Sequence, residues 1–244
     1  MKKQFQYLIF LLLLLLFTGG CILGGQTVTG NGDVISVNRP VGNYDGIVVA
    51  GSMHVFVKQG PVQDTRIEAE SNLIPYVVTR LSDDGELEVR FKKDIRRVIS
   101  HHPVNIYLTV PVIRHLSLLG SGDIKTQDTL TSGDKIKLNV AGSGDIQIQM
   151  NAPELDAHIA GSGDIMVSGE TKNMDLNILG SGDFKGSDLK SEQASVKIAG
   201  SGNAHVFSSI RLATKIFGSG NVYYQGSPSV ETTSAGSGKV MKED

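Results

Sequence analysis

The sequence predicts an all-β protein whose larger part is a parallel β-solenoid. Gly-Ser-Gly occurs seven times, at intervals of 18 to 22 residues, which indicates a repeat architecture. Apolar and polar residues alternate on both sides of each copy, and helical periodicity is absent from the repeats. A unit of about 19 residues cannot bury its apolar row alone, whereas units stacked in register can.

The third copy illustrates the expected geometry. Period-two alternation places successive side chains on opposite faces of a strand, and both glycines fall on the apolar face. We therefore expect strand, glycine corner, strand in each unit, with little side-chain volume inside the corner and backbone angles that glycine permits. The inward positions of this copy are Leu155, Ala157, Ile159, Gly161, Gly163, Ile165 and Val167.

Residues 1–20 are expected to be a lipoprotein signal peptide and not part of the fold. Lys2 and Lys3 form a basic start, and the apolar run from Leu8 to Phe17 is too short to span a bilayer. The signal would end just before Cys21, which is the only cysteine of the chain.

Cys21 is the expected lipidation site. Small residues followed by cysteine resemble the bacterial lipobox, in which the cysteine is lipidated, although Thr18 stands where that motif usually has Leu. The alternative is an ordinary signal peptide with an incidental cysteine. Residues 21–37 are expected to be a tether.

Residues 38–110 predict a less regular N-terminal β segment. The run from Ile47 to Val57 alternates around Gly51-Ser52, a degenerate corner. Strands over 77–81 and 87–91 flank a turn that contains Gly85, which predicts a hairpin. A further strand is expected over 104–110.

The charge balance excludes a nucleic-acid footprint. The chain carries 23 basic and 25 acidic residues, and loss of residues 1–20 would remove two lysines and no acid. A cluster of basic residues around Asp94 is expected to be a solvated loop. This cluster consists of Lys92, Lys93, Arg96 and Arg97, followed by His101 and His102.

Residues 111–244 are expected to form the GSGD-repeat solenoid, in which an outward acidic position follows four of the corners. Asn at the same position in two later copies favours local turn chemistry, because Asp and Asn both hydrogen-bond nearby backbone. The alternative is a strip that binds a cation or another ligand, since carboxylates on strands about 4.8 Å apart would recruit a counter-ion. The acidic positions are Asp123, Asp145, Asp164 and Asp183, and the later ones are Asn203 and Asn221.

No catalytic residues, metal ligands or cofactor are expected. The corner serines lack a periodic histidine partner, so a nucleophilic triad is unsupported. The six histidines show no metal-ligand spacing apart from the adjacent pair His101-His102.

The last repeat is expected to cap the stack. Two of its inward positions, Thr232 and Ser234, are hydroxylated, and Lys239 and Lys242 place charge on the terminal strand, which opposes docking of another chain. The alternative is a tail that never joins the stack.

The chain also resembles a known family. "NRPVGNYDGIVVAGSMHVFVKQG" (38–60), "IEAESNLIPYVVTRLSDDGELEVRF" (67–91) and the repeated "GSGDI" are similar to the putative auto-transporter adhesin, head GIN domain family, DUF2807, over roughly residues 40 to 225. The resemblance implies exported bacterial proteins, often lipoproteins, with a right-handed β-helix. It supplies no catalytic residues.

These observations favour a non-enzymatic lipoprotein of the cell envelope, in the outer membrane, that acts as an adhesin-like binding module or a scaffold. The expected partners are the membrane, through the lipid anchor, and an envelope glycan or protein. One alternative is a polysaccharide-active β-helix enzyme with paired carboxylates. Another is a calcium-stabilised structural spacer.

Overall fold

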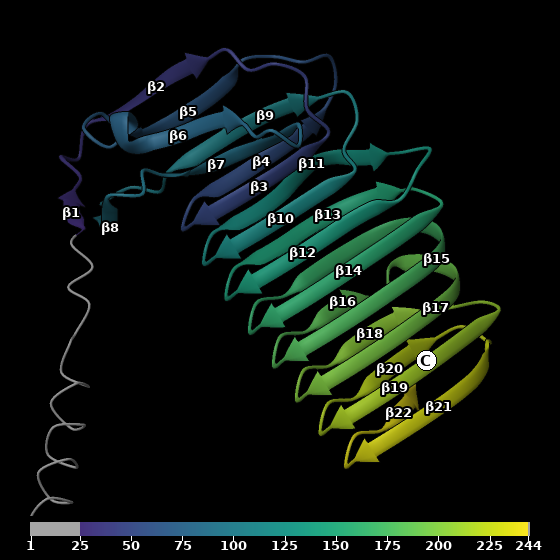
Figure 1. The fold of residues 1–244 in the computed structure, drawn as a ribbon. Helices are drawn as coiled ribbons and strands as arrows, with labels where there is room; N and C mark the ends of the chain where they lie inside the picture. Colours follow the sequence, from purple (N-terminus) through teal and green to yellow (C-terminus); the bar gives the residue numbers. More distant parts are fainter. Residues whose placement is uncertain (1–24, 244) are drawn as a thin grey trace, which may run out of the picture.

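The computed structural model describes residues 25–243, most of which form a parallel β-solenoid. The expected signal peptide and Cys21 lie outside the described residues. Each coil places one strand in each of two layers, and in most coils a glycine corner joins the two strands (Figure 1). Within the described residues no helix is long and apolar enough to cross a membrane.

Layer 1 contains the strands that run into the corners. Neighbouring strands of this layer pair in parallel and in register, so that Gly120, Gly142 and Gly161 are aligned. In spatial order the strands are β7 (Glu86–Phe91), β3 (Gly46–Gly51), β10 (His115–Gly120), β12 (Ile136–Gly142), β14 (Glu154–Gly161), the second parts of β15 (Ile165–Gly180) and β17 (Leu189–Gly200), β19 (Arg211–Gly218) and β21 (Ser229–Gly236).

Layer 2 contains the strands that leave the corners. β15 and β17 run from this layer into layer 1, so the two layers form one continuous hydrogen-bonded sheet. In spatial order the strands are β9 (Asn105–Val110), β4 (His54–Gln59), β11 (Asp123–Thr131), β13 (Asp145–Asn151), the first part of β15, β16 (Phe184–Gly186) with the first part of β17, β18 (Ala204–Phe207), β20 (Val222–Gln225) and β22 (Val240–Lys242).

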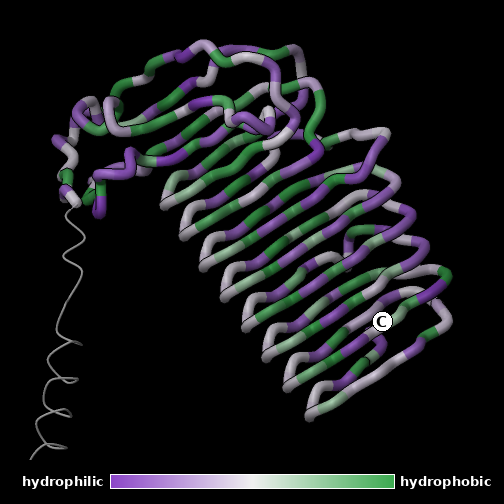
Figure 2. Tube along the Cα trace, viewed as in Figure 1, coloured by the Kyte–Doolittle hydropathy of each residue, from purple (hydrophilic) through white to green (hydrophobic). Residues whose placement is uncertain are grey.

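The core lies between the layers. Hydrophobic and hydrophilic residues alternate along each strand in Figure 2, and the inward set is buried as the period-two pattern predicts. The largest fully buried side chains are Phe184, Ile47, Met53, Ile67, Leu73, Leu87, Ile106, Leu108, Ile113, Leu116, Leu118 and Ile124.

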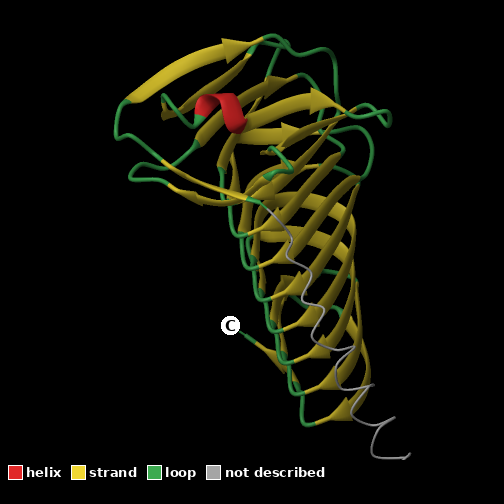
Figure 3. Cartoon of the chain, turned by 60° about the vertical axis from the view of Figure 1, so that its left-hand side comes forward, coloured by secondary structure: helices red, strands yellow, loops and turns green. Residues whose placement is uncertain are grey.

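The corners require glycine because of the neighbouring coil, not only because of the interior. The first glycine of each corner has positive φ, as at Gly142 (φ 131°), and a Cβ there would lie 2.3 Å from the carbonyl oxygen of Gly120. A Cβ at Gly144 would lie 2.1 Å from the carbonyl oxygen of Gly122. The stacked corners are visible edge-on in Figure 3.

Antiparallel strands lie at the N-terminal end of both layers, and we call this arrangement the N-terminal closure. The expected hairpin is confirmed: β6 (Val77–Leu81) pairs antiparallel with β7, and Gly85 has φ 79°. In layer 2, β5 (Thr65–Glu70) pairs antiparallel with β9 and with β2 (Val34–Arg39). The 3-10 helix η2 (Ile74–Tyr76) joins β5 to β6.

The coils do not stack in sequence order at this end. The coil of β3 and β4 has the coil of β7 and β9 on one side and the coil of β10 and β11 on the other. Both of these neighbours come later in the chain. Parallel stacking therefore includes residues that we assigned by sequence to the N-terminal β segment.

Two short strands correct the expectations for the polar segments near this end. β1 (Gln26–Thr29) pairs in parallel with β8 (Ile95–Ile99) in a separate two-stranded sheet. The basic cluster therefore includes a strand and is not a loop, although its basic side chains are solvated as expected. β1 and most of β2 fall within 21–37, where we expected a tether, because their backbones pair with β8 and β5.

The last coil joins the stack. β21 pairs with β19 from Ser229 to Gly236, and β22 pairs with β20. The alternative of a tail outside the stack is therefore wrong. The inward hydroxyls are hydrogen-bonded: Thr214 Oγ1 lies 3.0 Å from Thr232 Oγ1, and Ser234 Oγ donates to the carbonyl of Gly238 at 3.2 Å.

Candidate functional site

The acidic row forms a chain of hydrogen bonds from coil to coil. Oδ1 of Asp145 accepts the backbone N–H of Asp164 at 2.9 Å, and Oδ1 of Asp164 accepts that of Asp183 at 2.9 Å. The same contact continues from Asp183 to Asn203 at 2.7 Å. Asn203 and Asn221 extend the chain in the same way.

This geometry accounts for the exchange of Asp for Asn, because both residues carry an oxygen acceptor at the same place. Local turn chemistry, which the sequence favours, would place the accepted N–H in the residue's own turn. In the structure the accepted N–H belongs instead to the next coil. Across residues 25–243, no group of three or more His, Cys, Asp or Glu could hold a metal ion. Cation binding by the row stays a prediction.

Asp123 stands apart from the other acids of the row. Its carboxylate contacts His54 Nδ1 at 2.7 Å, and the backbone N–H of Asp145 donates to the carbonyl of Gly122. Of the four acids that the sequence identifies, three therefore accept the backbone N–H of the next coil, and Asp123 does not.

Lys185 connects the row to the exposed face of layer 2. Its ammonium donates to Oδ2 of Asp164 at 2.6 Å, and this hydrogen bond raises the pKa of Lys185. The contact neutralises one carboxylate in the middle of the row.

A groove lies on the same face between two places where the coils carry additional residues. Asp123 and Thr131 of β11 align with Asp145 and Asn151 of β13, so β11 holds two additional residues, with a register shift after Lys125. These form one wall, Thr126 to Asp128. The second wall is Ser187 and Asp188, where the coil of β16 is longer than that of β15 by one residue.

The groove has a volume of about 740 Å³, and its floor consists of outward side chains of β13 and β15. Sequence reasoning missed it, although a signal was present. The intervals of 22 and 20 residues after Gly120 and Gly180 are the two longest between corners, and they contain the two walls. The lining of the groove includes Gln127, Gln147, Gln149, Met166, Ser168 and Asp188.

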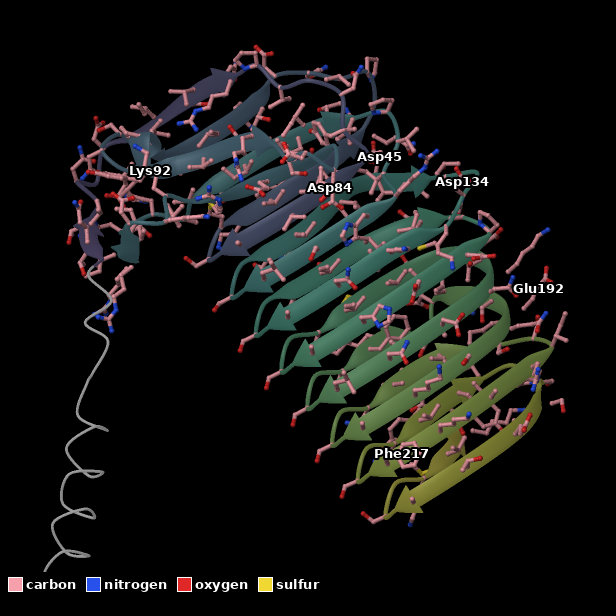
Figure 4. All side chains as sticks on the ribbon, in the orientation of Figure 1. Asp45, Asp84, Lys92, Asp134, Glu192 and Phe217 are labelled. Carbon is pink, nitrogen blue, oxygen red and sulfur yellow. The ribbon has the colours of Figure 1, made fainter. Side chains whose placement is uncertain are left out.

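Layer 1 carries an exposed apolar column beside the corners, at a position whose parity predicts polar residues. Leu119, Leu179 and Phe217 are 43%, 59% and 55% exposed. Phe217 is labelled near the corner edge in Figure 4, where side-chain oxygens of the corners also follow the edge. We define the apolar column as Leu119, Ala141, Ala160, Leu179, Ala199, Phe217 and Ala235, which share the position before the first corner glycine.

A family model described as "Putative auto-transporter adhesin, head GIN domain" (DUF2807) matches residues 43–228. No curated protein matches the chain at a significant level.

Several solved structures share the fold. A putative adhesin from Bacteroides fragilis NCTC 9343 has a TM-score of 0.83 at 20% identity, covering 88% of this chain and 100% of its own. A putative lipid binding protein from Parabacteroides distasonis ATCC 8503 has a TM-score of 0.73 at 25% identity, covering 90% and 100%. A putative adhesin from the same organism has a TM-score of 0.70 at 26% identity, covering 89% and 100%.

Proposed function

Because the chain belongs to DUF2807, the family described as putative auto-transporter adhesin, head GIN domain, we propose that it is a non-enzymatic, adhesin-like binding module of the cell envelope. The observation that carries this proposal is that the acidic row serves the stacking of the coils, whereas the groove and the apolar column face outward. The acidic row is engaged in holding successive coils together. The groove and the apolar column lie on broad outward faces of the kind that solenoids use for binding.

A lipid on Cys21 would attach the module to a membrane, and we propose the outer membrane. The support comes from the sequence alone: a short apolar run with a basic start, followed by small residues and the only cysteine. Lipid labelling and fractionation of the wild type and Cys21→Ser test the anchor. If Cys21→Ser stays in the membrane fraction after a high-salt wash, Cys21 is not the anchor.

Adhesion itself is tested on cells that express the chain in a heterologous Gram-negative host. Protease treatment of intact cells first establishes whether the chain faces outward. Cells with the wild type should then adhere to host-cell or mucin-coated surfaces more strongly than cells with Cys21→Ser, which exports the same fold without the anchor. A protease-resistant chain, or equal adhesion by both strains, would contradict the adhesin function.

A second candidate is contact with a lipid surface. The specific observation in its favour is the apolar column, whose larger side chains are exposed along layer 1. A structural relative at 25% identity is described as a putative lipid binding protein. Co-sedimentation of the chain with phospholipid vesicles should then weaken when Leu179 and Phe217 are both changed to Ser.

A further inference from the structure

We propose that the groove between Thr126–Asp128 and Ser187–Asp188 binds a neutral oligosaccharide segment that lies along the strands. This proposal rests on the proposed binding function and names the class of ligand.

The position of the groove excludes a peptide that would add a strand. Its floor strands, β13 and β15, are each paired in parallel on both sides, so neither offers a free backbone edge. The walls stand on β11 and at the turn after β16, three strand spacings apart, or about 14 Å. A ligand must therefore be recognised by side chains.

The polar groups of the groove fall into two sets. The first set is already engaged: Oγ1 of Thr126 accepts the N–H of Gln149 at 3.1 Å, and the carboxylate of Asp128 accepts the N–H of Gln59 at 3.0 Å. These contacts fix the wall next to β13. The second set makes no side-chain hydrogen bond to any other residue in 25–243, and consists of Gln127, Gln147, Gln149, Ser168 and Asp188.

Amide, hydroxyl and carboxylate groups together offer both donors and acceptors, which is what a polyhydroxylated ligand requires. Met166, which is 42% exposed on the floor, adds an apolar surface for the carbon face of a sugar ring. Such sites combine a few placed polar groups with apolar contact.

The charge of the groove disfavours an anionic ligand. Its two basic side chains are both engaged: the ammonium of Lys185 donates to Asp164, and Nδ1 of His205 lies 3.3 Å from a carboxylate oxygen of Glu243. Asp128 and Asp188 place carboxylates on both walls. A phosphate, a sulfated glycan or a nucleic acid would meet these carboxylates without a free cation in the groove to balance them. A neutral glycan meets no such repulsion.

The test uses the chain without residues 1–20, probed on a printed array of neutral and acidic oligosaccharides. The neutral oligosaccharide with the strongest signal is then titrated by calorimetry. Gln147→Ala combined with Gln149→Ala should weaken binding about tenfold or more, because two floor amides are lost. Ser168→Tyr, which fills the groove, should abolish it.

The matched control is Asn177→Ala combined with Gln193→Ala, which removes two amides from the outer face of layer 1. It should bind like the wild type, and unchanged melting temperatures should show that all variants fold. Absence of binding to every neutral oligosaccharide, a preference for acidic ones, or equal loss in the control would each overturn the proposal.

Cell adhesion and glycan binding by the purified chain together distinguish the groove assignment from the adhesin function. If cells carrying the Gln147→Ala, Gln149→Ala variant still adhere like the wild type, the groove is not the adhesive site and the function stands. If the purified chain binds neutral glycans through the groove but cells carrying it do not adhere, the groove assignment stands and the adhesin function fails.

Discussion

The corner residues are constrained by the coil stacked against them. A Cβ at Gly163 would lie 2.1 Å from the carbonyl oxygen of Gly144 and 2.9 Å from Cγ1 of Val140. Both contacts are closer than atoms tolerate, and the carbonyl belongs to a backbone that is itself fixed by stacking. Ser162, between the two glycines, is exposed.

Gly163→Val should therefore destabilise the protein by more than about 2 kcal/mol, as overpacking against fixed neighbours does. Ser162→Ala should cost less than about 0.5 kcal/mol, since it changes an exposed side chain. Urea denaturation of the two variants measures both effects. Similar losses would mean that stacking does not constrain the second glycine.

The acidic row should tolerate asparagine better than alanine. Asp145→Asn with Asp164→Asn should be tolerated, because each Asn keeps the oxygen that accepts the next coil's N–H. Asp145→Ala with Asp164→Ala should cost about 1 to 2 kcal/mol through the loss of two acceptors. Calcium should leave all three melting temperatures unchanged. A calcium-dependent rise in the wild type that disappears in the Asn variant would instead support the cation strip.

Among the elements, the N-terminal closure depends on a buried carboxylate that the sequence did not single out. Glu70, at the end of β5, is fully buried and accepts backbone N–H groups of Gly32 at 2.5 Å, His101 at 2.6 Å and His102 at 3.1 Å. It therefore ties the segment before β2 and the segment before β9 to β5. The pKa of Glu70 is lowered to about 2, chiefly by the hydrogen bond from Gly32 and further by those from His101 and His102.

A lowered carboxyl pKa stabilises the folded state above the unfolded pKa, and this stabilisation is lost as pH falls through the folded pKa. For Glu70 the window runs from about pH 4.5 down to about pH 2. Glu70→Gln should therefore lower the melting temperature at pH 7, and its difference from the wild type should shrink toward pH 2. Glu192→Gln, an exposed change on the side of the solenoid away from the glycine corners (Figure 4), is the control and should change little at either pH. A constant difference across the window would show that ionised Glu70 does not stabilise the closure.

The two ends of the whole molecule are built differently. The outermost strands at the N-terminal end, β2 and β6, are antiparallel to their neighbours, whereas β21 and β22, at the other end of the described stack, are parallel strands of a regular coil with unpaired outer edges. An unpaired edge invites association, and hydroxyls and charges on the last coil oppose it. Beneath that coil, Leu212, Ile216 and Val222 are fully buried.

Deletion of residues 226–244 should expose this apolar surface and the edges of β19 and β20, so that the chain oligomerises or aggregates. Static light scattering of the truncated and full chains measures the change. A truncated chain that remains a stable monomer would mean that the last coil is not a cap.

Local sequence determined the solenoid. Period-two alternation decides which face of a strand is buried, and the repeat aligns equivalent positions from coil to coil, so the corners, the hairpin at Gly85 and the inward core could be predicted from particular residues. The groove was only hinted at by the two longest intervals between corners. Its ligand chemistry depends on which side chains are already hydrogen-bonded, and that is a property of contacts between coils.

Tertiary structure alone decided which segments that are distant in the sequence contact one another. The insertion of β3 and β4 between coils that follow them in the chain, and the burial of Glu70 among backbone N–H groups from two other segments, leave no mark on local periodicity. The acid row is the clearest example: parity placed Asp145 and Asp164 outward, but only stacking revealed that each accepts the N–H of the next coil. Periodicity specifies the face of a residue within its own strand, whereas its partners across coils depend on how the whole chain closes on itself.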